Sequence, residues 1–327
     1  MMRLQFDLRS SIQRFKIWAV SFRGSITLFA LVGVLLVPLS GSPYLTQIVI
    51  SAMIMAIFAG SWDLLAGYAG QTSFGHSAFF GISGYVTAAF VKFLGQNWIV
   101  ALIAGAAVAV LSSLLIGIPC LRLKGPYLAL GTLAFSLILF NLFLTGTWLG
   151  GTEGISGLPG SGNKFAVFYL MAAFMIISLI AMKAIVDSRL GTVLKAIRDD
   201  EVCADASGIN TTVYKLIAFM ISGFFAGIAG ALFVLDTTAV NPAVYQPLYS
   251  FYAIIMASIG GIATIYGSII GAFLFVILSE LLRPLAATAL LIFATLLILI
   301  VRFAEQGVMN PFLNRFQEYY DKLRGRI

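Results

Sequence analysis

Long apolar runs separated by short polar interruptions fill most of the chain. A helix that crosses a bilayer needs about 20 mostly apolar residues, and runs close to that length recur from residue 25 to residue 302. These runs do not alternate between polar and apolar positions, as the strands of an outer-membrane barrel would. The pattern therefore predicts an all-α integral membrane protein, a polytopic helix bundle.

The same pattern predicts about ten spanning segments, some of them broken or re-entrant. Gly260 and Gly261 separate two short segments, which favours a bend or a re-entrant pair over one straight helix. The expected spans are 25–41, 44–66, 73–94, 98–119, 127–149, 165–185, 214–235, 250–262, 266–282 and 286–302.

Composition narrows the classes of function. Apolar residues make up 60% of the 327 residues and charged residues 10%, whereas a soluble domain is about 45–50% apolar and about 25% charged. A lone soluble enzyme is thereby excluded. His76 is the only histidine and the two cysteines lie far apart in the sequence, so we expect no catalytic residue, no metal site and no cofactor.

The 20 basic residues indicate how the chain is oriented. With the amino terminus in the cytoplasm, cytoplasmic segments hold five basic residues in 1–24, two at 122–124, five in 183–215 and five from 302 onward, seventeen of the twenty. Such an excess in cytoplasmic loops is the rule for membrane proteins. We therefore expect both termini in the cytoplasm, and we interpret the net charge of +7 as orientation, with no nucleic-acid partner.

This orientation divides the chain into a basic cytoplasmic segment, 1–24, a transmembrane domain, 25–302, and a cytoplasmic tail, 303–327. The small residues at 40–42 leave a cleaved amino-terminal signal as the alternative for the first span.

Small residues recur at every fourth position in three segments. Because lipid provides little drive for helices to associate, such stripes let backbones approach closely. We expect them to pack the bundle and to carry no information about cargo. They are Gly105, Ala109, Ser113 and Gly117, then Gly223, Gly227 and Ala231, then Gly267 and Gly271.

Residues 67–84 are too rich in glycine and polar side chains for a helix that faces lipid. Broken backbone at membrane depth is tolerated only beside protein or a water-filled cavity, so we expect this segment to border a pathway. His76 has two interpretations: a histidine at a helix break that neighbouring carbonyls or hydroxyls satisfy, or a residue with a direct or proton-linked role in the pathway.

Residues 150–162 are glycine-rich and are expected outside the cell. They fit a flexible solvated loop equally as well as a docking element, with Glu153 as the only charge.

The loop 187–214 is the longest polar connection between predicted spans. Leu190, Val193, Leu194 and Ile197 share one helical face, while Lys195, Arg198 and Asp199 face elsewhere. A second short helix begins at Asp199 or Asp200 and ends at Ser207, with Gly208 free to turn and Asn210 or Thr211 capping the next span. Five basic and five acidic residues cancel within 183–215, so we expect the loop to contact a protein partner.

At these residues the chain resembles a family. The resemblance to LivM-type permeases of bacterial branched-chain amino acid ABC importers covers most of 44–302, in order. The four stretches that carry it are GYAGQTSFGHSAFFGISGY, GTEGISGLPG, AIRDDEVCADASGINTTVYKLIAFMISGFFAGIAGALF and SIGGIATIYGSIIGA.

The resemblance implies a non-catalytic, multi-pass permease subunit of the bacterial cytoplasmic (inner) membrane, surrounded by membrane lipid. It implies pairing with a second related permease and the receipt of substrate, a branched-chain amino acid, from a periplasmic or lipid-anchored binding protein. Two cytoplasmic ABC ATPase subunits would supply the energy. Importers of urea, short amides or a sugar would share this fold and coupling.

The family's coupling motif falls on Ala196, Ile197, Arg198, Asp199, Glu201, Ala204, Ala206, Gly208, Ile209 and Asn210. Together with our interpretation of the loop, the residues expected to couple to the ATPase are Leu194, Ile197, Arg198, Asp199, Asp200, Glu201, Ala204 and Gly208. The family's glycine-rich motif falls on Gly67, Gly70, Gln71, Ser73, Gly75, His76, Gly81 and Gly84. The residues expected to border the translocation pathway are Gly70, Gln71, Ser73, His76 and Ser77.

Two other classes are weaker. An ion-coupled secondary transporter would use intramembrane carboxylates, and Asp63, Asp236 and Glu280 all lie toward the ends of predicted spans. An intramembrane enzyme would need a nucleophile with a base or a cluster of metal ligands, and the sequence offers neither.

Overall fold

The structure is a computed structural model that describes residues 33–123, 125–160, 163–285, 288, 291–295 and 298. Within these ranges six helices are long and apolar enough to cross a membrane. They are α3 (Pro43–Asp63, continued by the π-helix η2, Leu64–Tyr68), α4 (Ser77–Leu94), α5 (Trp98–Cys120), α6 (Pro126–Thr145), α7 (Lys164–Val186) and α10 (Thr211–Thr237).

Two shorter apolar helices form the expected bent pair. They are α11 (Pro247–Gly260) and α12 (Ile265–Leu281), and the chain bends by 113° between them. The all-helical class and the break after Gly260 are thus confirmed. The predicted spans 25–41 and 286–302 lie largely outside the described residues, as do 1–24 and 303–327, so the count of about ten spans and the location of both termini stay predictions.

The remaining elements are short. They are η1 (Val37–Ser40), η3 (Thr147–Leu149), η4 (Gly151–Glu153), α8 (Arg189–Asp199), α9 (Glu201–Ala206), η5 (Pro242–Tyr245) and η6 (Arg283–Leu285).

Two predicted boundaries were wrong by about one helical turn. Helix α4 begins at Ser77 and not at 73, because residues 70–76 have irregular backbone that starts with Gly70 at φ +68°. Helix α6 ends at Thr145 and not at 149, because Gly146 adopts extended backbone before η3.

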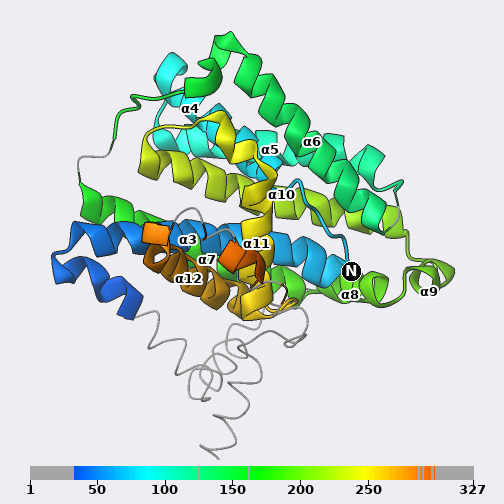
Figure 1. Cartoon of the computed structure of the whole chain (residues 1–327). Coiled ribbons are helices and arrows are strands. Elements are labelled where there is room, and N and C mark those ends of the chain that lie inside the picture. The colour runs from blue at the N-terminus through cyan, green and yellow to red at the C-terminus, as the bar shows by residue number, and fades with distance from the viewer. Residues whose placement is uncertain are drawn as a thin grey trace, which may run out of the picture.

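Helices α3 and α10 lie along each other through the middle of the bundle (Figure 1). Helices α4 and α5 pack against α10 on one side, and α7 and α12 pack against α3 on the other. Helix α11 crosses the direction of the long helices, and α8 and α9 lie together at one end of the bundle (Figure 1).

The small-residue stripes pack these helices as predicted. A Cβ added at Gly223 would lie 2.7 Å from the Cβ of Ser113, and one added at Gly227 would lie 2.7 Å from the Cβ of Ala109. A Cβ at Gly271 would meet the carbonyl oxygen of Met256 at 1.8 Å. Glycine is therefore required where α5 meets α10 and where α11 meets α12.

Contacts between helix termini define two ends of the bundle. At one end, which we call the loop end, η2 follows α3 and α10 begins; α8 packs against both η2 and α10, and α9 packs against α8 and α10. At the opposite end Gln47 Nε2 donates to Asp236 Oδ2 at 2.7 Å, joining the start of α3 to the end of α10, and the Tyr44 hydroxyl donates to Glu280 near the end of α12. Helices α3 and α12 therefore run antiparallel.

The segment before α11 returns into the interior of the bundle. The backbone carbonyl of Tyr245 accepts hydrogen bonds from the hydroxyls of Ser77 at 3.2 Å and Ser136 at 2.5 Å. The Tyr245 side chain is fully buried, and a Cβ at Gly81 would lie 2.5 Å from its ring. Helix α11 thus starts inside the bundle and reaches the loop end with only 14 residues.

Candidate functional site

The loop 187–214 contains the two short helices that its sequence predicts. Helix α9 begins after Asp200, whose side chain accepts a hydrogen bond from the amide of Cys203 at 3.0 Å. Gly208 turns the chain with φ +83°, and Asn210 caps α10 by accepting from the amide of Val213 at 3.1 Å. The predicted caps are confirmed, and Asp200 and Asn210 are the residues that form them.

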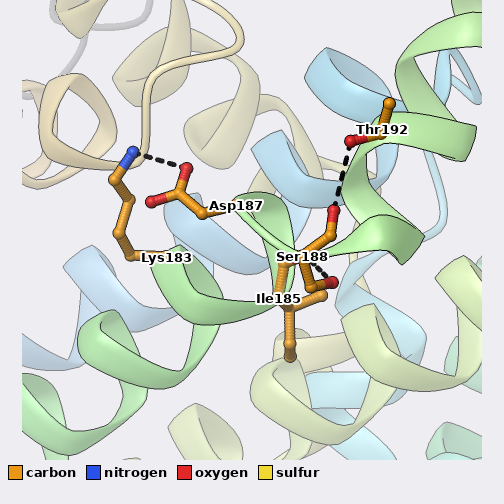
Figure 2. A network of polar contacts seen from close by, with 5 residues as sticks. All are labelled: Lys183, Ile185, Asp187, Ser188 and Thr192. Atoms are coloured by element: carbon orange, nitrogen blue, oxygen red, sulfur yellow. Dashed lines mark hydrogen bonds and ion pairs between the residues drawn. The ribbon is translucent and has the colours of Figure 1, made fainter. Parts of the chain in front are cut away.

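The corner between α7 and α8 is fixed by short-range contacts (Figure 2). Lys183 Nζ lies 2.9 Å from Asp187 Oδ1, the Ser188 hydroxyl donates to the carbonyl of Ile185 at 2.6 Å, and Thr192 Oγ1 donates to the carbonyl of Ser188 at 3.3 Å. A Cβ at Gly191 would lie 2.0 Å from the carbonyl oxygen of Val186. Helix α8 is therefore packed directly against the end of α7.

Helix α9 is attached to α10 by an ion pair. Lys215 Nζ lies 2.5 Å from Glu201 Oε2, and the lysine side chain is only 8% exposed whereas the glutamate is 45% exposed. Ala204 is buried, and its carbonyl accepts from the amide of Ile209 at 3.2 Å. Among the described residues, Glu201 is the one carboxylate that forms an ion pair with this buried ammonium.

The apolar face of α8 packs against the bundle of this chain, whereas the sequence led us to expect that a partner protein would cover it. Leu194 and Ile197 are buried, and Leu190 and Val193 are half-buried. Asp199, Asp200 and Glu201 are exposed. The expectation that Arg198 faces away was wrong in part: its Nη1 donates to the carbonyl of Gly67 at 2.8 Å, while Nη2 lies 2.8 Å from Asp199 Oδ1. The long arginine side chain extends from α8 to a backbone carbonyl of η2. Helical periodicity shows which face a residue is on, but it does not show which distant group the side chain contacts.

Gly70, three residues after Gly67, makes this approach of Arg198 possible. Gly70 is at φ +68°, and a Cβ there would lie 3.2 Å from Cα of Arg198. Lys195 adds a further contact, since its Nζ lies 5.5 Å from the centre of the Tyr68 ring. The glycine-rich segment and the loop 187–214, which are about 130 residues apart in the sequence, therefore meet at the loop end.

Asp63 also lies in this region, although the sequence did not indicate that it contacts the other residues here. Its side chain is fully buried, and its Oδ1 accepts from the amide of Ala263, in the break between α11 and α12, at 2.7 Å. A carboxylate inside a predicted span is a signal of function in general. The partner could not have been found from the sequence, because it is a backbone amide 200 residues away.

The five expected pathway residues separate into two groups. Gly70 is exposed and Gln71 is half-buried, with its Nε2 donating to the carbonyl of Ala69 at 3.1 Å. Ser73, His76 and Ser77 are fully buried within the chain.

Hydroxyl groups surround the buried histidine. His76 Nε2 lies 2.9 Å from Ser61 Oγ and 3.3 Å from Ser222 Oγ, so the side chain joins α3, α4 and α10. Nδ1 has no hydrogen-bond partner among the described residues. This environment matches the interpretation of His76 as a helix-break histidine held by neighbouring hydroxyls.

Residues 150–160 lie at the opposite end and are held in place. Ile155 and Val240 exchange two backbone hydrogen bonds of 2.8 Å, Leu158 N donates to the carbonyl of Thr238 at 3.3 Å, and Lys92 Nζ donates to the carbonyl of Ser156 at 2.9 Å. These hydrogen bonds attach the described part of this loop to the ends of α4 and α10.

Removal of Glu201 should loosen α9 more than removal of Lys215. Glu201→Ala leaves a buried ammonium without a charge partner, whereas Lys215→Met leaves a carboxylate that water reaches. Hydrogen exchange of the amides of 201–206 should accelerate by about tenfold in Glu201→Ala and by less than about twofold in Lys215→Met. No acceleration in Glu201→Ala would show that the ion pair does not hold α9, and equal acceleration in both variants would contradict the role given to the buried ammonium.

Comparisons with known proteins agree with one another. A family model described as "Branched-chain amino acid transport system / permease component" matches residues 44–301. The high-affinity branched-chain amino acid transport system permease protein LivM of Salmonella typhimurium (strain LT2) is 28% identical over 288 residues, which covers 79% of this chain and 68% of the relative. The LivM protein of Escherichia coli (strain K12) gives the same identity and coverage.

No solved structure gives a significant match. The family match extends over α3 to α12 and includes the loop 187–214. The chain belongs to the family of permease components of branched-chain amino acid transport systems.

Proposed function

We propose that this chain is the membrane-spanning permease subunit of an ABC importer, that it forms the translocation pathway for branched-chain amino acids, and that α8 and α9 couple this pathway to partner ATPases. The observation that carries the proposal is the attachment of α8 and α9 to the bundle. They contact α7 through the corner, α10 through Glu201 and Lys215, and η2 through Arg198. A push on this unit is therefore transmitted to three parts of the membrane domain.

The outer surface of α8 and α9 suits a protein partner. Asp199, Asp200 and Glu201 are exposed beside Val202, which is 79% exposed. An exposed apolar side chain at the tip of a charge-balanced loop gains by burial against a protein and would gain nothing from a lipid headgroup. We propose that two cytoplasmic ATPase subunits bind the assembled permease, one of them at this surface, and that hydrolysis of ATP takes place on them.

The physical mechanism is alternating access. ATP binding brings the ATPases together, α8 and α9 move as rigid levers, and the packed helices rock between states that open to opposite sides. The energy comes from the different affinity of ATP for the two states, and this chain transmits it. The ordered loop 150–160 is proposed as part of the surface that receives a periplasmic or lipid-anchored binding protein, with a second related permease completing the pathway.

The distribution of charge supports a bacterial inner-membrane orientation with the loop end in the cytoplasm. Lys183, Arg189, Lys195, Arg198 and Lys215 all belong to the loop end, and Arg122 follows α5, whose Gly117 faces Leu216 of α10 at that same end. Helix α3 ends at the loop end, next to the break from which α12 starts. Because α12 runs antiparallel to α3, it returns the chain to the opposite end. One further span at 286–302 would then place the basic tail in the cytoplasm.

Uptake by the assembled importer tests the substrate. We expect ATP-dependent accumulation of leucine in proteoliposomes that contain the complex and its binding protein, with competition by isoleucine and valine and none by urea or ribose. Selective competition by urea or ribose would assign the chain to another cargo of the same class. Uptake that follows an ion gradient without ATP would contradict the ABC mechanism.

Photocrosslinking tests the docking surface. A benzophenone amino acid at Val202 should crosslink to an ATPase subunit in the assembled complex. The control is the same probe at Ile138 of α6, which is 61% exposed on a membrane-spanning surface and should give no ATPase adduct. An adduct at Ile138, or none at Val202 in a complex that hydrolyses ATP, would reject α8 and α9 as the docking site.

The pathway residues are tested by paired substitutions. We propose that Gly70 and Gln71 border the pathway and that Ser73, His76 and Ser77 hold the segment in place behind it. Gln71→Ala and His76→Ala should each lower uptake while leaving the amount of assembled complex unchanged. Gln96→Ala, an exposed glutamine between α4 and α5, should leave uptake unchanged. Wild-type uptake kinetics in both variants would contradict the pathway role of Gln71 and the supporting role of His76.

A further inference from the structure

Four residues from three distant parts of the sequence meet at the loop end, and we call this contact the 63–263 joint. Asp63 ends α3, Gly67 lies in η2, Arg198 is near the end of α8, and Ala263 lies in the break between α11 and α12. Arg198 donates to Gly67, and Ala263 donates to Asp63. The joint therefore connects the loop 187–214 to the bent pair through the end of α3.

The carboxylate of Asp63 is in an unusual position for an acidic side chain. It is fully buried on a spanning helix, where an acidic side chain is unfavourable unless other groups interact with it. Its Oδ1 accepts from a backbone amide at 2.7 Å, while its Oδ2 has no hydrogen-bond partner among the described residues. Because an amide that loses its acceptor inside the protein costs free energy, this hydrogen bond holds the break in place.

The backbone on the other side of the joint is constrained. Ala263 has φ +62°, a backbone conformation that residues other than glycine rarely adopt. A non-glycine residue keeps such a conformation only where its surroundings impose it, and the bond to Asp63 is the side-chain contact that holds its amide. Next to it, Ile262 is 46% exposed at the surface of the break.

Gly67 lets these groups approach without a gap. A Cβ there would lie 2.3 Å from Asp63 Oδ1 and 2.6 Å from the amide nitrogen of Ala263. The carbonyl of the same residue accepts from Arg198 at 2.8 Å. η2 is a π-helix, an irregularity often found at functional sites, and it turns this carbonyl toward α8.

We infer that Asp63 is a positioning residue that makes the break between α11 and α12 follow the movement of α8. This inference rests on the proposed function, because it assumes that an ATPase moves α8. When α8 shifts, Arg198 carries the Gly67 carbonyl, the adjacent Asp63 carboxylate carries the amide of Ala263, and the bent pair moves with the coupling loop. Movement would be transmitted through a series of close contacts, because these groups are packed without space between them.

The test measures coupling in the assembled complex, as the amount of leucine taken up for each ATP hydrolysed. Asp63→Ala removes the acceptor, and this ratio should fall by about tenfold while ATP hydrolysis continues. Asp63→Asn keeps an oxygen acceptor of the same shape and should retain most of the ratio. Asp236→Ala is the matched control, since this carboxylate also accepts a side-chain bond on a spanning helix but lies at the opposite end.

A second variant reaches the joint without removing any polar group. Gly67→Ala forces a methyl group between Asp63 and Ala263 and should also uncouple transport from hydrolysis. Normal coupling in an assembled Asp63→Ala or Gly67→Ala complex would overturn the inference. So would a loss in Asp236→Ala equal to that in Asp63→Ala.

A measurement on the otherwise wild-type chain guards against variants that fail to fold. A cysteine at position 262, with Cys203 replaced by serine, should react with a membrane-impermeant maleimide at a rate that ATP changes. A rate insensitive to ATP would overturn the role of Asp63 even if no variant assembles. If crosslinking at Val202 succeeds while this rate stays constant, only the inference fails; if that crosslink is absent, the proposed function fails.

Discussion

A buried carboxylate at the end of a spanning helix is the constraint on which the loop end depends. Asp63 accepts a hydrogen bond from the amide of Ala263. Ala263 lies in the break where the chain bends by 113° between α11 and α12. Gly67 brings the same point within reach of Arg198. Without this contact, the part-buried amide of Ala263 would lack its acceptor, and the break would no longer be joined to the end of α3 by a side-chain hydrogen bond. These contacts join the loop 187–214 to the bent pair through the end of α3.

The rest of the bundle gives these joined elements something rigid to move against. Close contacts between α5 and α10 and between α11 and α12 depend on glycines that admit no methyl group. His76 joins α3, α4 and α10 through two serine hydroxyls. Such packing has few intermediate arrangements, so a displacement at α8 is expected to shift whole helices and not to be absorbed locally.

Much of the fold could be predicted from local patterns. Apolar runs predicted the spans that the structure describes, and small residues at every fourth position predicted helix contacts. The caps were narrowed to Asp199 or Asp200 for α9 and to Asn210 or Thr211 for α10, and the structure selects Asp200 and Asn210. The sequence could not show which groups meet across the bundle. The direction of Arg198, the acceptor role of Asp63 and the return of Tyr245 into the interior each depend on partners 100 or more residues away. The start of α4 and the end of α6 were misplaced because hydropathy does not show the irregular backbone of residues 70–76 or the extended backbone of Gly146.

The most direct measurement is the distance between spin labels at positions 202 and 262 in the assembled importer, with Cys203 replaced by serine, in the presence and absence of ATP. Both positions are exposed, at 79% and 46%. If the joint makes α8, α9 and the break one rigid unit, the distribution of distances stays the same in the two states while the distance from 202 to a label at Leu94, at the opposite end, changes. A shift in the 202–262 distance on ATP binding would contradict this unit and the coupling route through Asp63.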